Sequence, residues 1–261
     1  DLRSAVESRD LRVVYQPIVA MNTMRIASCE ALCRWDHPDL GPISPGIFIP
    51  LAEEMGIISE ISTFVLHAAC TECAKWPDQT SVSVNLSARD FRSRDVIQKV
   101  RDALANSGLA AGRLEIEVTE TALLDDKSLT RQYIEELKQL GVRIALDDFG
   151  TGYSSLSYLH KLPLDKIKID RSFVMDITHN PRSLELLKGV VDLTRILGLT
   201  VTIEGVETFE QLKVLLHSVK PDLVQGFLFG AALSASGIET MSNVTWPFAA
   251  DLRLAAKRTA G

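Results

Sequence analysis

The chain has 261 residues, of which 46% are hydrophobic and 24% charged, a composition typical of a globular protein rather than a disordered or fibrous one. Its 34 acidic and 28 basic residues give a net charge of −6, which argues against polymeric nucleic acid as a partner, because such a partner needs a basic surface. The longest charge-free stretch, residues 223–238, is too short to span a membrane. We therefore expect a cytoplasmic domain. Because the chain begins at Asp1 rather than methionine, we also expect a longer full-length protein with regulatory domains, which could include a membrane anchor.

Short apolar and β-branched runs alternate with longer amphipathic stretches along the chain. The predicted strands cover residues 13–19, 27–35, 82–86, 114–118, 143–148, 166–170, 200–205 and 223–229. The predicted helices cover residues 58–76, 90–106, 129–140, 182–197 and 209–219. Such alternation predicts βαβ units and a mostly parallel sheet. Eight strands fit an α/β fold of the (β/α)8 TIM type better than an open doubly wound sheet, because no GxGxxG segment follows the first strand.

The first predicted strand should differ in direction from the rest. Only residues 20–25 separate it from the second strand, and this loop is too short for the crossover helix that two parallel strands need. We therefore expect an antiparallel first strand and a barrel that is modified at this point.

Polar and charged residues stand at the C-terminal ends of seven consecutive predicted strands. In chain order they are Glu30, Asn85, Glu117 with Glu120, Asp147 with Asp148, Lys168 with Asp170, Glu204 with Glu207, and Gln225. A single glutamate there would be an ordinary surface charge, but a set on seven strands indicates a site, because carboxylates are rare in strands. In a barrel these strand ends meet at one mouth, where the loops form the active site.

Carboxylates gathered without histidine or cysteine indicate a site for hard divalent cations, since oxygen ligands favour magnesium, manganese or calcium over zinc. The adjacent Asp147 and Asp148 form a natural bridge between two ions, which could together bind both oxygens of a phosphoryl displacement. Lys168 would stabilise developing charge or orient the attacking water, and Arg34 would bind a ligand phosphate.

Two of the four cysteines, Cys70 and Cys73, form a CxxC segment. Such a segment can be a redox pair, half of a zinc site, or two thiols on one helix face. We favour the last interpretation, because the segment lies inside a predicted helix and no second CxxC follows it.

The segment EALCRW at residues 30–35 resembles the signature of the EAL-domain cyclic di-GMP phosphodiesterases. Other segments resemble the family's motifs in the same order: YQPI (15–18), FIP (48–50), NLS (85–87), EVTE (117–120), DDFGTGYSS (147–155), DKIKID (165–170), EGVE (204–207) and QGF (225–227). The resemblance covers about residues 5–240.

This resemblance implies a modified (β/α)8 barrel that hydrolyses cyclic di-GMP to linear pGpG in bacterial second-messenger signalling. It implies two Mg²⁺ or Mn²⁺ ions, held by Glu30, Asn85, Glu117, Asp147 and Asp148. Lys168 and Glu204 would position and activate the attacking water, either of them as the base, and Gln225 would join their hydrogen-bond network.

The resemblance also implies substrate contacts and a dimer. The implied substrate-binding residues are Gln16, Leu32, Arg34, Asp170, Glu207 and Phe227. Glu120 would anchor the loop 149–155, which in this family lies near the interface of a homodimer. We expect the barrel to occupy residues 1–242 and residues 243–261 to form a C-terminal tail, either packed on the barrel through residues 246–248 or flexible.

One position departs from the family, and two alternatives stay open. Ala231 and Ala232 stand where the family usually has a basic residue and a proline, which affects one contact to a guanine edge. A non-catalytic cyclic di-GMP receptor is the first alternative, although such receptors typically lack metal-site residues that this chain retains. A metal-dependent lyase that forms a Schiff base through Lys168 is the second.

Overall fold

Eight strands of the protein close into a barrel, as the computed structural model shows for residues 2–8, 10–77, 79–125, 127–150, 162–241 and 246. Around the barrel the strands are β1 (Leu11–Ala20), β2 (Arg25–His37), β4 (Ser81–Leu86), β5 (Leu114–Thr119), β6 (Arg143–Phe149), β7 (Lys166–Ile169), β8 (Thr200–Ile203) and β9 (Leu223–Gln225). The short β3 (Gly41–Ile43) only extends β2 as a hairpin. The TIM-type fold predicted from the alternation is confirmed.

The first strand runs antiparallel to both of its neighbours, as its short connection predicts. β1 pairs antiparallel with β2 and with β9, whereas all other neighbouring pairs in the barrel are parallel. The turn between β1 and β2 is closed by a hydrogen bond from Met24 N to Ala20 O at 2.8 Å.

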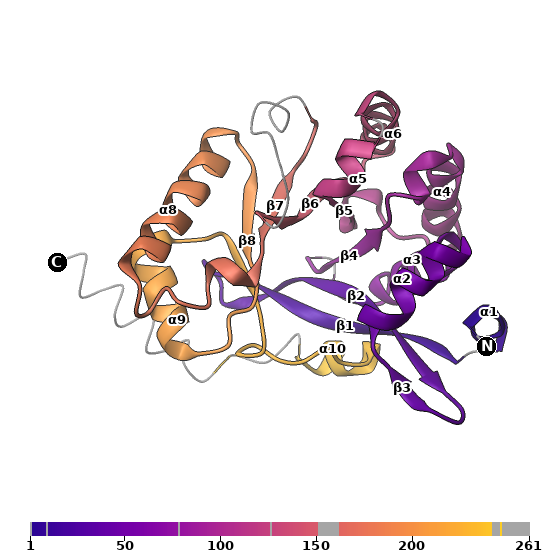
Figure 1. Ribbon diagram of the computed structural model, residues 1–261, viewed down its shortest axis with the longest axis horizontal. Coiled ribbons are helices and arrows are strands. Elements are labelled where there is room, and N and C mark those ends of the chain that lie inside the picture. The colour runs from indigo at the N-terminus through magenta and orange to yellow at the C-terminus, as the bar shows by residue number, and fades with distance from the viewer. Residues whose placement is uncertain are drawn as a thin grey trace.

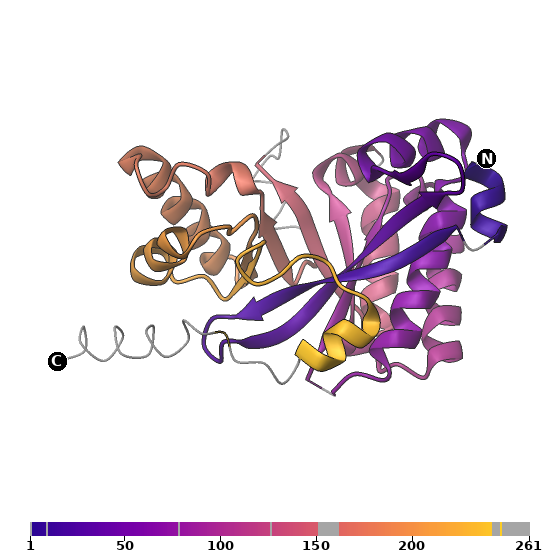
Figure 2. The same cartoon turned by 90° about the horizontal axis from the view of Figure 1, so that it is seen from below.

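Helices cover the outside of the barrel in two groups (Figures 1 and 2). One flank carries α3 (Ile58–Cys73), α4 (Asp95–Ser107) and α6 (Lys127–Gln139), and the other carries α8 (Pro181–Ile196) and α9 (Phe209–Val214). The two helices of the second group begin at capping residues that the sequence shows. Asn180 caps α8 ahead of Pro181, and Thr208 and Gln211 form a capping box on α9.

Four short helices were not predicted from the pattern: α1 (Leu2–Ser8), α2 (Pro45–Met55), α5 (Glu120–Asp125) and α10 (Ala235–Met241). α2 begins where Ser44 accepts a hydrogen bond from Gly46 N and Pro45 occupies the first turn. The cluster of glycine and prolines in this segment suggests a loop, yet Phe48 and Ala52 bury one face of the helix.

Three predicted boundaries are wrong for identifiable reasons. The strand predicted over 223–229 ends at Gln225, because Gly226 packs so tightly on Val206 that a Cβ atom would lie 2.2 Å from its carbonyl oxygen. The helix predicted from residue 90 begins at Asp95, since the Asp90 carboxylate accepts hydrogen bonds from Ser59, Ser62 and Ser87 and holds residues 90–92 in a 3-10 turn. The helix predicted over 209–219 changes into a π-helical turn after Val214.

The side chains of each strand divide between two environments. Outward-facing residues such as Val84, Ile116 and Val118 are completely buried beneath the helices. Cys70 and Cys73 are also buried in α3 with free thiols, and burial raises the pKa of the Cys73 thiol to about 11, in agreement with the structural interpretation of the CxxC segment. The inward-facing residues are mostly polar, and they build the site described below.

The tail is described only in part. Trp246 is buried, and its indole nitrogen donates a hydrogen bond to Phe229 O at 3.2 Å. The other residues predicted for the tail, and residues 151–155 of the predicted loop, lie outside the described residues. Within the described part of the chain, none of the helices has both the length and the apolar character needed to cross a bilayer.

Candidate active site

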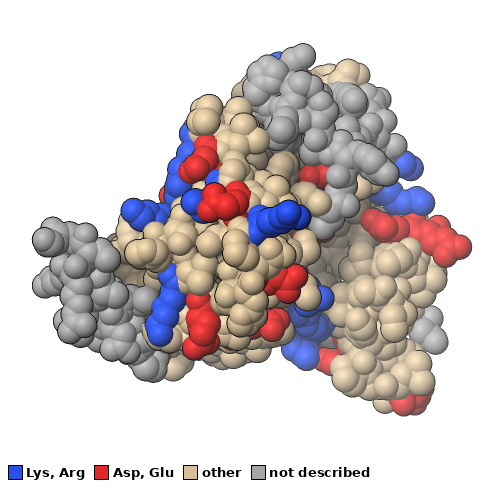
Figure 3. All heavy atoms as spheres, turned by 60° about the vertical axis from the view of Figure 1, so that its left-hand side comes forward, with Lys and Arg blue, Asp and Glu red and all other residues tan. Residues whose placement is uncertain are grey.

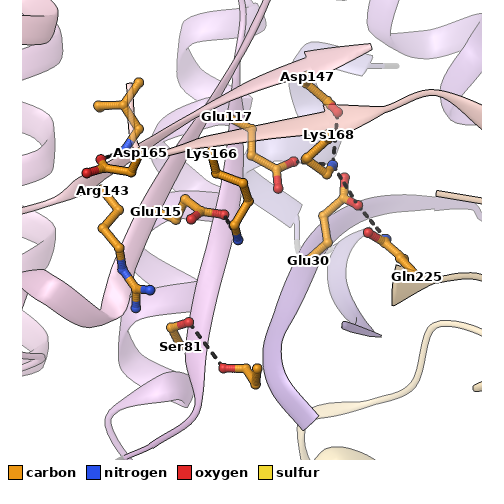
Figure 4. A network of polar contacts seen from close by, with 12 residues as sticks. Glu30, Ser81, Glu115, Glu117, Arg143, Asp147, Asp165, Lys166, Lys168 and Gln225 are labelled. Atoms are coloured by element: carbon orange, nitrogen blue, oxygen red, sulfur yellow. Dashed lines mark hydrogen bonds and ion pairs between the residues drawn. The ribbon is translucent and has the colours of Figure 1, made fainter. Parts of the chain in front are cut away.

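A buried lysine lies at the centre of the polar cluster inside the barrel (Figure 4). The Lys168 ammonium lies 2.8 Å from Glu117 Oε2, 2.8 Å from Glu204 Oε1, 3.0 Å from Asp147 Oδ1 and 3.3 Å from Glu30 Oε2. Its side chain is only 1% exposed. Burial alone would lower the pKa of Lys168, but the four surrounding carboxylates, Asp147 first, raise it well above its ordinary value. Lys168 is therefore a charged group in this arrangement.

Besides Lys168, two side-chain amides contact the Glu30 carboxylate. Asn85 Nδ2 donates to Glu30 Oε1 at 2.7 Å, and Gln225 Nε2 donates to Glu30 Oε2 at 2.7 Å. Gln225 also lies 3.3 Å from Gln16 Oε1 on β1. Burial would raise the pKa of Glu30, but the Lys168 charge and the two amide hydrogen bonds outweigh it and lower this pKa. Glu30 is thus held as a carboxylate.

The acidic side chains form two overlapping groups of oxygen atoms. Glu30, Glu117 and Asp147 each bring one carboxylate oxygen within 4.8 Å of the others, and Asp147, Asp148 and Glu204 form a second such group. Asp147 belongs to both groups. Within the described residues, Glu117 Oε1 is buried and has no hydrogen-bond partner. Carboxylate oxygens in this number, one of them buried and unsatisfied, fit divalent cations such as Mg²⁺ or Mn²⁺.

A bulge in β6 lets two successive aspartates contribute to the same group. Neighbouring residues in a regular strand point to opposite faces. The pairing register of β6 with β7 shifts between Leu146 and Phe149, and Asp148 has a left-handed φ of 55°. Bulges of this kind redirect side chains and are common near active sites. The sequence shows both aspartates but gives no sign of this bulge.

Three acids of the cluster have raised pKa values. Burial raises the pKa of Glu117 well above its ordinary value, although the Lys168 charge acts in the opposite direction. Burial raises the pKa of Glu204 to about 7 against the lowering effect of Lys168, and Asp147 and Glu30 add smaller raising contributions. The pKa of Asp148 is raised by burial and by the adjacent Asp147. A carboxylate whose pKa lies near neutrality can accept and release a proton at physiological pH.

The predicted substrate-binding residues divide between two cavities. The first, about 280 Å³, is lined by Gln16, Asp170, Glu207 and Phe227 together with all the acids of the cluster except Glu117. The second, about 610 Å³, is lined by Leu32 and Arg34 together with Asn85 and α2 and α3 residues. Phe227 is 67% exposed, which is unusual for an aromatic residue and leaves it accessible to a ligand.

Glu120 lies where a loop anchor is expected. It is 4% exposed, and its Oε1 accepts a hydrogen bond of 3.1 Å from Gly150 N, at the first residue after β6. Gly150 has a φ of 98°, and a Cβ atom there would lie 2.3 Å from the Phe173 ring. The start of this loop is therefore tied to both Glu120 and the segment after β7.

The structure adds residues that were not predicted for the site. Arg171 and Gly205 line the first cavity, and a Cβ atom at Gly205 would lie 2.2 Å from Arg171 Cβ. Their positions directly after Asp170 and Glu204 at the strand ends are the signal that could have indicated them. A second buried ion pair, Glu115 with Lys166, lies beside the cluster inside the barrel.

Comparison with known proteins identifies the family of this chain. Residues 1–232 match the model of the EAL domain family, and the chain belongs to that family. It is 41% identical over 243 residues to the cyclic di-GMP phosphodiesterase NbdA of Pseudomonas aeruginosa, covering 92% of this chain and 31% of the relative. It is 39% identical over 241 residues to the oxygen sensor protein DosP of Escherichia coli, covering 91% of this chain and 30% of DosP.

A solved structure with a closely similar fold is the PaMucR phosphodiesterase in complex with c-di-GMP. It superposes with a TM-score of 0.86 at 40% identity, over 91% of this chain and 98% of that one. The chain spans only 28–39% of the length of curated relatives such as those above.

Proposed function

We propose that this domain is a metal-dependent phosphodiesterase that hydrolyses cyclic di-GMP to linear pGpG with two Mg²⁺ or Mn²⁺ ions. The observation that carries the proposal is the position of Asp147, which is shared by two groups of carboxylate oxygens around the buried Lys168. The names of NbdA and PaMucR, at about 40% identity, support the choice of substrate.

The residues that would hold the ions are Glu30, Glu117, Asp147 and Asp148, whose carboxylates gather in the cluster, together with Asn85, whose amide contacts Glu30. Bound ions would polarise the scissile phosphate and lower the pKa of a water. The chain supplies the remaining groups. Lys168 places a positive charge within 3.3 Å of four carboxylates, where it can orient water and stabilise the phosphorane oxygens.

Glu204 is our choice for the general base. Its pKa of about 7 lets it accept a proton near neutral pH, whereas Lys168 is held charged and has no lone pair to accept one. Gln225 keeps Glu30 and Gln16 in place through its amide nitrogen. The charged state of Lys168 also argues against the lyase alternative, because a Schiff base needs the neutral amine.

The two cavities suit an extended dinucleotide. One nucleoside would lie in the first cavity with its base against Phe227, near Gln16, Asp170 and Glu207. The other would occupy the more apolar second cavity, where Leu32 contacts it and Arg34 binds the second phosphate. Phe227 is exposed enough to stack on a base. Such stacking does not need the basic residue and the proline that the family usually has in place of Ala231 and Ala232.

We also propose which other domains and chains accompany this domain. Because the chain spans about a third of the length of its relatives, we propose that further regulatory domains accompany it in a cytoplasmic signalling protein. We also propose a homodimer in which Glu120 and the loop after β6 take part. Polymeric nucleic acid is not a proposed partner, since acidic and basic side chains are interspersed on the face shown in Figure 3.

Product analysis tests this function. The purified domain is incubated with cyclic di-GMP and Mg²⁺, Mn²⁺ or Ca²⁺ in turn, and the nucleotides are separated by chromatography. We expect linear pGpG with Mg²⁺ or Mn²⁺ and uncut substrate with a chelator. A domain that binds cyclic di-GMP but leaves it uncut with every metal would instead be a receptor.

A further inference from the structure

Inside the barrel, a second ion pair lies directly beside the catalytic cluster (Figure 4). Lys166 Nζ lies 2.6 Å from Glu115 Oε1, and the two side chains are 5% and 2% exposed. Lys166 precedes Lys168 by two residues on β7, and Glu115 precedes Glu117 by two residues on β5, so all four side chains face the barrel interior. The barrel therefore contains two parallel lysine–glutamate contacts, of which only one belongs to the proposed site.

The pairing register explains why this second lysine matters. Glu117 on β5 and Lys166 on β7 both pair with Ala145 on the intervening β6, so they stand at the same height on either side of it. Ala145 is buried and small, which leaves room for a long side chain to cross in front of β6. Lys166 reaches Glu115 by this route, and Glu117 is the carboxylate at its own level.

Glu117 has an oxygen without a partner to which Lys166 could donate a hydrogen bond. Its Oε2 contacts Lys168, while its buried Oε1 has no hydrogen-bond partner within the described residues. In the function proposed above, this oxygen is a metal ligand. An ammonium group that reached it would compete with the ion for the same position.

The charge of the cluster also indicates that a second ammonium group would weaken cation binding. Glu30, Glu117, Asp147, Asp148 and Glu204 carry five negative charges when ionised, and Lys168 neutralises one, which leaves four. Two divalent cations balance that remainder. A second ammonium turned toward the cluster would reduce it to three and weaken the attraction for the second ion.

We propose that Glu115 is a positioning residue that holds Lys166 away from Glu117, so that the acidic cluster stays free to bind two divalent cations. The inference rests on the metal dependence proposed above. A purely structural role for the pair would make loss of either partner equally harmful, since either loss leaves one unpaired buried charge. If Glu115 instead holds Lys166 away from Glu117, loss of Glu115 should weaken metal binding, whereas loss of Lys166 should not.

Manganese binding without substrate tests this difference. Free Mn²⁺ is measured by electron paramagnetic resonance during titration of the wild-type protein and of Glu115→Gln, Lys166→Met and the double variant. We expect Glu115→Gln to weaken binding by about tenfold, which is the lower end of the effect of residues that support metal ligands. Lys166→Met should bind as tightly as the wild type or more tightly, and the double variant should recover wild-type affinity within about threefold.

Lys138→Met is the matched control, because it breaks the ion pair between α6 and Asp165 (2.5 Å), which does not involve the acidic cluster, and should leave Mn²⁺ binding unchanged. Melting temperatures of all variants report on folding. The proposal is overturned if Glu115→Gln binds like the wild type, if the double variant stays as weak as Glu115→Gln, or if Lys166→Met binds tenfold more weakly. The last result decides the matter even if Glu115→Gln does not fold. A wild-type protein that binds no Mn²⁺ would contradict the proposed metal dependence as well.

Discussion

Asp147 and Asp148 are successive residues of β6, yet both place a carboxylate oxygen within 4.8 Å of Glu204. Regular strand geometry would send one of them to the outer face of the barrel. The register shift before Phe149 and the left-handed backbone of Asp148 bring both to the mouth. A non-glycine residue in that conformation is strained unless its surroundings maintain it, and such strain is concentrated at functional sites.

The bulge predicts different outcomes for two substitutions at residue 148. Asp148→Asn keeps a side chain that tolerates positive φ, so we expect a melting temperature within about 2 °C of the wild type. Turnover with Mg²⁺ should fall at least about 100-fold because a charged ligand is lost. Calorimetry and the product assay measure these two effects, and near-normal turnover would remove Asp148 from the metal site.

Asp148→Val serves as the comparison. A β-branched residue at a φ of 55° should cost about 1–3 kcal/mol of unfolding free energy, in contrast to the asparagine variant. Equal stability of the two variants would mean that the backbone relaxes there and stores no strain.

Glu30→Ala should abolish turnover while leaving much of the substrate affinity. The substitution removes one carboxylate from Lys168 and the acceptor of both Asn85 and Gln225. Lys168 loses one buried counter-charge and the buried Gln225 amide keeps only its 3.3 Å contact with Gln16, so the melting temperature should also fall. Cyclic di-GMP binding, measured by calorimetry with Ca²⁺, should persist through Arg34 and Gln16.

Glu185→Ala, on the exposed surface of α8, should change neither property and is the control. Normal turnover by Glu30→Ala would show that this residue is not a metal ligand.

Metal affinity should depend on pH through Glu204. The pKa of this carboxyl is raised to about 7 in the ion-free domain, mainly by burial, so below pH 7 it is mostly neutral and adds no negative charge beside Asp147 and Asp148 to attract a cation. Binding should therefore tighten as pH rises from 6 to 7, by up to about tenfold, and level off above pH 7.5. Titration with Mn²⁺ at a series of pH values measures this, and Glu204→Gln should lose the dependence in this range.

The same pKa has a consequence for stability. The folded, ion-free domain keeps a proton on Glu204 between about pH 4.5 and pH 7, whereas the unfolded chain has released it. Because the folded state binds more protons there, this group makes unfolding free energy fall as pH rises through that window. Stability that rose over the window relative to Glu204→Gln would contradict the assignment.

Much of this architecture could be predicted from the residues. Alternating periodicities indicated the barrel, the short loop after Ala20 indicated the antiparallel β1, and the polar strand ends indicated the cluster around Lys168. The missed features depend on contacts between distant segments. α2 contains Pro50 and looks like a loop until the burial of Phe48 is known. Whether Lys166 faces Glu115 or Glu117 depends on the register across β6, which no local pattern specifies.

Gly226 offers a test of the close packing that positions Gln225. A Cβ atom there would lie 2.2 Å from Val206 O and 2.3 Å from Val206 N, so Gly226→Ala must displace the segment between Glu204 and Gln225. We expect a loss of about 2–4 kcal/mol in unfolding free energy, together with reduced turnover. Gly189→Ala, in the middle of α8 with nothing within 4 Å, should instead stabilise the protein by about 0.5–1 kcal/mol. Chemical denaturation measures both, and unchanged stability of Gly226→Ala would contradict the packing described here.

The most direct test of the central claim is anomalous diffraction from crystals soaked in Mn²⁺. The account predicts two anomalous peaks at the mouth of the barrel. Oxygens of Asp147 should contact both, with Glu30 and Glu117 beside one and Asp148 beside the other. A single peak, or peaks that avoid Asp147, would contradict a two-metal mechanism for this domain.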